Sequence, residues 1–149
     1  MQFLEDANKA FRRADHMLYI TYPIVKEKRL LIKILEDICS SMRGIVNGVL
    51  YYDYAFKRIQ IYKEASMNLD VFAKVCAQRY SITPEQVGMI LEIFNLMKEH
   101  KDSSMEFIRR DKFVIMSENM HVESISIGKL KEYLYAVKDM YQKVSSRIK

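Results

Sequence analysis

Glycine, proline and cysteine are scarce in this chain, and tryptophan is absent. The 149 residues include four glycines, two prolines and two cysteines. Because helix interiors tolerate glycine and proline poorly, this scarcity favours an all-α fold. Half of the residues are hydrophobic and 29% are charged, a composition that is ordinary for a globular chain and argues against a disordered one. A chain of this length is about one domain, so we expect a single domain over residues 1–149.

The few cysteines and the lack of long apolar runs set the cellular context. Cys39 and Cys76 form no CxxC motif and too small a set for a disulfide framework. Both lie in apolar helical patterns, so we expect two buried reduced thiols, with a disulfide between them as the alternative. No run approaches the ~20 apolar residues of a membrane span. Charged residues such as Glu5 and Lys9 interrupt any N-terminal signal peptide. We therefore expect a cytoplasmic protein that engages no membrane.

The net charge of +5 is spread unevenly along the chain. Residues 1–63 carry +4, residues 64–100 carry −2 and residues 101–149 carry +3. If the two basic segments pack together, they form one positive face that suits an anionic partner. The alternative is a set of ordinary solvated helix surfaces, because acidic residues are interspersed nearly everywhere.

Hydrophobic residues at three- and four-residue spacing predict the helices. The first is expected over residues 3–21, where Tyr22 before Pro23 ends it. The second is expected over about 27–59 and would be roughly 50 Å long. After a connection at 61–68, a shorter helix is expected over 69–80. Thr83 and Gln86 form a capping box for a helix from Pro84 to about residue 100. Ser126 is expected to cap the last helix, which ends near residue 146.

The segment before the last helix has a different pattern. Residues 112–117 and 121–125 are rich in β-branched side chains and flank Glu118 and Asn119, which predicts a small β-hairpin. Residues 103–106 are expected to begin another helical turn. The overall prediction is an antiparallel bundle of four to five helices with this hairpin inserted before the last one.

Ser40, Gly44 and Gly48 lie four residues apart on one face of the long second helix. Small residues allow two helix backbones to approach closely. This face therefore predicts close helix packing, either within the chain or in a homodimer. A ligand that approaches the bare backbone is the remaining alternative.

Arg12, Asp15, His16 and Tyr19 form a polar stripe on the first helix. These side-chain types can perform acid–base chemistry on a phosphodiester. The alternative is an exposed polar face with contacts between neighbouring turns.

The end of the second helix combines aromatic and basic residues, as nucleic-acid surfaces do. Lys57 and Arg58 follow Tyr51, Tyr52 and Tyr54 at the end of the second helix. Aromatic rings beside basic residues can stack the bases of a single strand, although such tyrosines more often lie at the edge of a core.

The densest basic cluster consists of Arg109, Arg110 and Lys112, next to the expected hairpin. Such a cluster can contact phosphates, or it can be a solvated loop.

Motifs for metals and nucleotides are missing. His16, His100 and His121 lie far apart, and none has a partner at metal-ligand spacing. A glycine-rich phosphate loop and a G-x-S-x-G elbow are also absent. We therefore expect no metal and no cofactor.

Three segments carry a resemblance to known proteins. Residues 13–26, 50–59 and 111–115 resemble a family of small uncharacterised archaeal proteins, similar in overall pattern to HEPN-like helical bundles. That resemblance implies a bundle that dimerises and binds or cleaves RNA. Catalytic HEPN members carry an Arg, four to six residues and a His on a late helix. Here Arg12 and His16 are separated by three residues on the first helix, and Arg110 and His121 by ten. The resemblance therefore supports the bundle and the dimer but not nuclease activity.

These observations lead to one functional expectation and one alternative. We expect a non-catalytic helical binding module that is homodimeric through its second helix. The alternative is a HEPN-like RNA-binding protein or ribonuclease, with the stripe on the first helix as its catalytic residues. In that case the basic residues near positions 57 and 110 would contact RNA.

Overall fold

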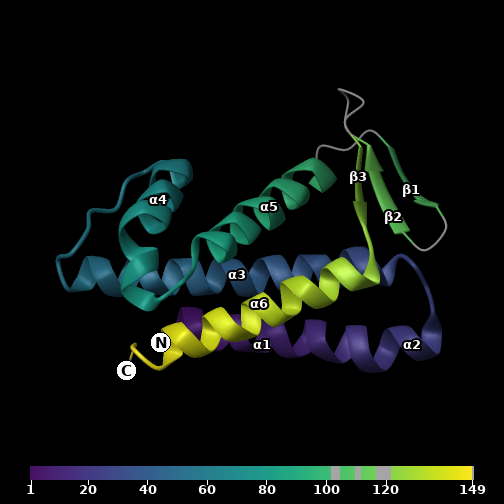
Figure 1. Cartoon of the computed structure of the whole chain (residues 1–149), viewed down its shortest axis with the longest axis horizontal. Coiled ribbons are helices and arrows are strands. Elements are labelled where there is room, and N and C mark those ends of the chain that lie inside the picture. Colours follow the sequence, from purple (N-terminus) through teal and green to yellow (C-terminus); the bar gives the residue numbers. More distant parts are fainter. Residues whose placement is uncertain (102–104, 110–111, 117–121, 149) are drawn as a thin grey trace.

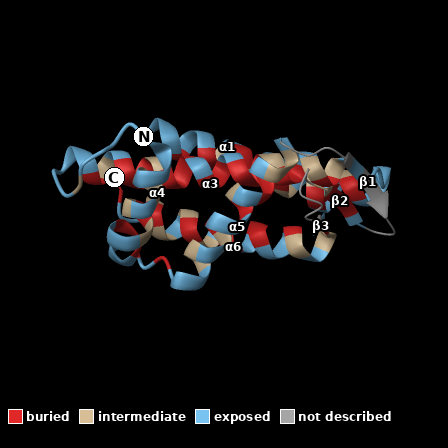
Figure 2. Ribbon diagram, turned by 90° about the horizontal axis from the view of Figure 1, so that it is seen from above, coloured by how far each residue is buried: buried red, intermediate tan, exposed pale blue. Residues whose placement is uncertain are grey.

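The computed structural model describes residues 1–101, 105–109, 112–116 and 122–148. Within them, five helical stretches and a three-stranded sheet follow one another along the chain. Figures 1 and 2 show two layers, with α1 (Gln2–His16) and α3 (Leu30–Ala55) in one and α5 (Pro84–Lys101) and α6 (Ile127–Ser145) in the other. The predicted all-α bundle with a small hairpin before the last helix is confirmed. No helix among the described residues is both long and apolar enough to cross a membrane.

The first helix continues past the proline that was expected to end it. α1 passes into a π-helical turn, η1 (Met17–Thr21), and then into α2 (Tyr22–Val25). The backbone N–H of Tyr22 donates to the carbonyl of Met17, five residues back, so the wider turn lies directly before Pro23. Such turns accommodate local irregularities in a helix. The helix ends where Lys26 adopts a left-handed conformation with φ 56°.

α3 is the longest helix, with 26 residues, or about 39 Å at 1.5 Å per residue. It begins at Leu30 and ends at Ala55, so the expected span of 27–59 was too long at both ends. It packs along its length against α1 and is also contacted by α5 and α6. Most of its apolar side chains are therefore buried within the same chain, while Tyr51 and Tyr54 near its end remain exposed.

The glycine face of α3 is what brings α1 close. A Cβ atom placed on Gly44 would lie 2.8 Å from both the Cβ of Ala7 and the carbonyl oxygen of Phe3. At Gly48 the nearest atom would be Cδ2 of Leu4, at 3.2 Å. These two glycines thus allow close packing within the chain. Because α1 covers this face of α3, the face is not open to a second copy.

Ser40 does not share that role, because its side chain is exposed. The neighbouring Ser41 is buried instead. Its hydroxyl donates to the carbonyl of Ala7 at 2.8 Å, which adds a hydrogen bond to the α1–α3 contact.

The middle of the chain folds as two further helical stretches. The first is α4 (Ala65–Val71), continued by the π-helical η2 (Phe72–Cys76) and the 3-10 helix η3 (Ala77–Tyr80). It starts four residues earlier than the predicted Leu69. α5 follows, and its capping box is confirmed. The N–H of Gln86 donates to Oγ1 of Thr83 and the N–H of Thr83 donates to Oε1 of Gln86, both at 3.1 Å.

The sheet has one strand more than expected. β2 (Lys112–Met116) pairs antiparallel with β3 (Val122–Ile125), as predicted. On its other edge β2 pairs with β1 (Met105–Arg109), where a helical turn was expected. That expectation was wrong because the local sequence did not reveal the β2 edge with which this segment pairs.

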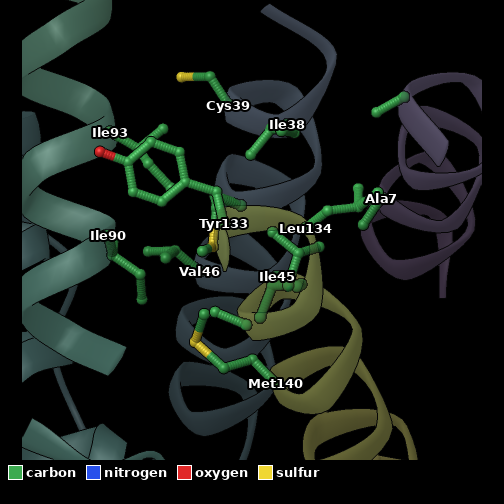
Figure 3. Close-up of a cluster of buried hydrophobic side chains, with 14 of the residues drawn as sticks. Ala7, Ile38, Cys39, Ile45, Val46, Ile90, Ile93, Tyr133, Leu134 and Met140 are labelled. Atoms are coloured by element: carbon green, nitrogen blue, oxygen red, sulfur yellow. The ribbon is translucent and has the colours of Figure 1, made fainter. Parts of the chain in front are cut away.

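α6 closes the core. Ser126 caps it by accepting a hydrogen bond from the N–H of Lys129, as predicted. Figure 3 shows Tyr133, Leu134 and Met140 of α6 packed between α1, α3 and α5. All three side chains are buried. Cys39 and Cys76 are also buried and are not joined to each other, as the reduced-thiol interpretation expected.

Candidate functional site

The polar stripe on the first helix does not assemble into a site. Arg12 and His16 are exposed and Asp15 is half-buried. Among the described residues, none of these three side chains takes part in a hydrogen bond or ion pair. Tyr19 instead lies under Lys131 of α6, whose Nζ is 5.5 Å from the ring centroid. The stripe therefore contains no hydrogen-bonded acid–base pair among the described residues.

The basic cluster at the hairpin is only partly within the described residues. Arg109 ends β1 and Lys112 begins β2, and the two are paired across the strands. Lys112 is exposed. Arg110 lies outside the described residues, as does His121.

His16 and His100 do not contribute to a metal site among the residues that the structure describes. There, no group of three or more His, Cys, Asp or Glu side chains is arranged to hold a metal ion. His100 is instead hydrogen-bonded through Nδ1 to Oε2 of Glu106 at 2.5 Å.

Lys57 and Arg58 lie at a sharp turn that ends α3. Lys57 has φ 58°, in the left-handed region that glycine usually occupies at such ends. The N–H of Arg58 then donates to the carbonyl of Asp53 at 2.9 Å, which closes a turn over residues 53–58. This turn directs Arg58 back along α3, so that its guanidinium reaches the Asp53 side chain.

Asp53 is fully buried and is the centre of an ion-pair cluster. Its carboxylate accepts hydrogen bonds from Nη1 of Arg58 at 3.0 Å, from Nη1 of Arg79 at 2.6 Å and from the hydroxyl of Tyr80 at 2.8 Å. A buried carboxylate is costly unless it is paired and hydrogen-bonded. Here both oxygens are bound, so the cluster is chemically satisfied.

The two other ionisable groups at Asp53 remain protonated near neutral pH. Burial, followed by the hydrogen bond to Asp53 and its negative charge, raises the pKa of the Cys76 thiol to about 12. The same causes raise the pKa of Tyr80. A thiol must ionise to act as a nucleophile. Cys76 is therefore a hydrogen-bond donor in this cluster.

The outer side of the cluster is aromatic and basic. The guanidinium carbon of Arg58 lies 5.3 Å from the ring centroid of Phe56 and 5.8 Å from that of Tyr52. Phe56 is 58% exposed. A hollow of about 410 Å³ has Lys57, Arg58 and Tyr62 in its lining. We call the surface formed by Tyr52, Phe56, Lys57, Arg58 and Tyr62 the basic–aromatic end.

A second arginine extends the positive charge. Arg79, whose side chain is 38% exposed, pairs with Asp53, and Nη1 of Arg147 donates to the carbonyl of Arg79. One carboxylate thus faces two guanidinium groups, and a third guanidinium is adjacent. The local charge is positive, which is the electrostatic condition for binding a phosphate backbone.

Part of this site could be anticipated and part could not. Lys57, Arg58 and the neighbouring tyrosines stood out in the sequence. Arg79 and Tyr80 did not, because they lie 26 and 27 residues from Asp53 and no periodic pattern connects them.

Comparison with protein-family models, curated proteins and solved structures found no match. The function is therefore inferred from the geometry alone.

Proposed function

We propose that this protein is a non-catalytic binding module for single-stranded nucleic acid, most simply RNA, and that it binds through the basic–aromatic end. The observation that carries the proposal is the exposed Phe56 ring, with Arg58 against it and Lys57 beside it. Proteins that bind single strands without sequence preference combine a basic groove with rings on which bases stack.

The buried Asp53 cluster supports the proposal by fixing Arg58. An arginine that is held by a carboxylate and by two rings loses little further side-chain entropy when it binds a phosphate. Its side chain is still 39% exposed, and Nη1 alone is hydrogen-bonded to the carboxylate. The remaining N–H groups are the ones that would contact the strand.

The proposed binding requires neither cleavage of the strand nor a second copy of the chain. Among the described residues, the side chains of Arg12, Asp15 and His16 take part in no hydrogen bond or ion pair. Gly44 and Gly48, on which a homodimer through the long helix was expected, pack on α1. A single chain is sufficient for the binding surface described.

Fluorescence anisotropy with a labelled single-stranded oligouridylate tests this function. We expect binding at low salt that weakens as salt rises, because phosphate contacts release counterions. Phe56→Ala should weaken binding about tenfold or more, since stacking contributes ~1–3 kcal/mol per base. Lys57→Gly should reduce the salt dependence while leaving the fold intact, because glycine suits the left-handed conformation.

Lys26→Gly is the matched control for Lys57→Gly. Lys26 has the same backbone conformation, with φ 56°, but precedes α3 whereas Lys57 follows it. The control should bind RNA like the parent protein. Absence of binding at low salt, or an equal loss in the Lys26 and Lys57 variants, would refute the proposed function.

A further inference from the structure

A cleft of about 400 Å³ lies between α3, α4 and α5. Its wall is mainly apolar and is formed by Val46, Leu50, Leu69 and Phe94. The volume lies within the range of small-molecule sites, which are mostly apolar with a few polar groups that orient the ligand. The polar groups of this cleft therefore indicate what it could hold.

Arg43 is the only charged residue in the described lining of the cleft. Its guanidinium carbon lies 5.8 Å from the ring centroid of Phe94, and its Nη2 is 3.8 Å from Sγ of Cys39. Among the described residues it forms no ion pair with a carboxylate. A guanidinium has five N–H donors, so most of the donors of Arg43 are available to a ligand.

Asn47 lies one helical turn after Arg43 and lines the same cleft. Its side chain is half-buried and has no hydrogen bond to any other described residue. Asn68, by contrast, is fully engaged, since its amide bonds the N–H and the carbonyl of Tyr62 at 2.8 Å each. Positions four apart on a helix are neighbours, so Arg43 and Asn47 present free donors side by side.

We propose that this cleft binds a small amphipathic carboxylate. The carboxylate accepts hydrogen bonds from Arg43 and from the amide of Asn47, and the apolar body lies against Leu50, Leu69 and Phe94. A planar guanidinium matches a carboxylate well. This site shares no residue with the basic–aromatic end, so the two proposals stand or fall separately.

Calorimetric titration with decanoate tests the site, with decanol as the uncharged ligand of equal chain length. Decanoate should bind saturably, and more tightly than decanol. Arg43→Met removes the charge but retains an apolar side chain. It should weaken decanoate binding about tenfold or more, as expected when a hydrogen bond to a charged group is lost. It should leave decanol binding unchanged.

Two further variants separate the site from general effects. Arg12→Met removes an exposed arginine from α1 and should bind decanoate like the parent protein. Ala65→Trp, at an exposed position in the lining, should fill the cleft and weaken both ligands. Failure of decanoate to bind saturably, or equal affinity in the parent and the Arg43→Met variant at equal thermal stability, would overturn the proposal.

Discussion

Nη1 of Arg79 lies 2.6 Å from Oδ2 of Asp53, and this contact ties η3 to the last turn of α3. Asp53 has no exposed surface, and its other oxygen is bound by Arg58 and Tyr80. The cluster thus joins three segments and holds the surface that we propose for binding. Its integrity matters for stability as well as for function.

Asp53→Asn should be strongly destabilising. The substitution keeps the shape of the side chain but leaves two guanidinium groups without their carboxylate. Breaking a fully buried pair in this way costs about 3–5 kcal/mol. Because the side chains of Arg58 and Arg79 are 39% and 38% exposed, water screens the charges that remain, and we expect a loss at or below the lower end of that range. Urea unfolding measures the change. Asp70→Asn is the control, because Asp70 forms an exposed pair with Lys74 and such pairs contribute ~0–1 kcal/mol. Equal effects at the two positions would contradict the account of Asp53.

Gly44→Ala should destabilise the α1–α3 contact. The added Cβ would lie 2.8 Å from the backbone oxygen of Phe3, which cannot move without shifting α1. Overpacking of this kind costs about 1–3 kcal/mol. Gly88→Ala is the matched control, since a Cβ at Gly88 meets nothing within 4 Å. The control should raise the free energy of unfolding by up to ~1 kcal/mol through helix propensity. Two changes of the same sign would show that α1 does not pack as described.

Lys26→Gly should stabilise the protein. Lys26 has φ 56° at the end of α2, and a residue with a Cβ pays about 1–2 kcal/mol in this conformation. Part of the gain is offset because glycine is more flexible in the unfolded chain, so we expect a net increase of about 0.5–1 kcal/mol. Lys33→Gly, at an exposed position inside α3, should instead lower stability by ~1 kcal/mol. Thermal unfolding of both variants checks the sign.

Stability should fall in alkaline solution because of Cys76. Burial raises the pKa of this thiol from 9.0 to about 12 in the folded protein. The unfolded chain therefore loses its thiol proton first, and folding loses free energy as pH rises from about 9 to about 12. Cys76→Ser has no thiol to ionise there, so its stability should decline less between about pH 8 and about pH 11. Parallel declines in the two proteins, measured by urea unfolding at both pH values, would assign the alkaline loss to other groups.

Local signals in the sequence determined most helix positions. The Thr83–Gln86 capping box and the Ser126 cap depend on side chains within one turn of the backbone that they bond, so the sequence alone was enough to find them. The apolar periodicity of α3 and α6 likewise identified their inward faces. One local signal was misleading: Pro23 did not end the first helix, because the π-helical turn η1 directly before it accommodates the proline.

The tertiary structure decided what each face contacts. The small-residue face at Gly44 and Gly48 could have packed against a helix of the same chain or against a second copy. In the structure it packs against α1, where Ala7 and Leu4 lie opposite the two glycines. β1 is a strand because β2 offers it an edge. The scarcity of glycine and proline favoured a helical chain, and the structure confirms one with a small sheet. The pairing of Asp53 with Arg79 could come only from the fold, because interactions between residues so far apart leave no period in the sequence.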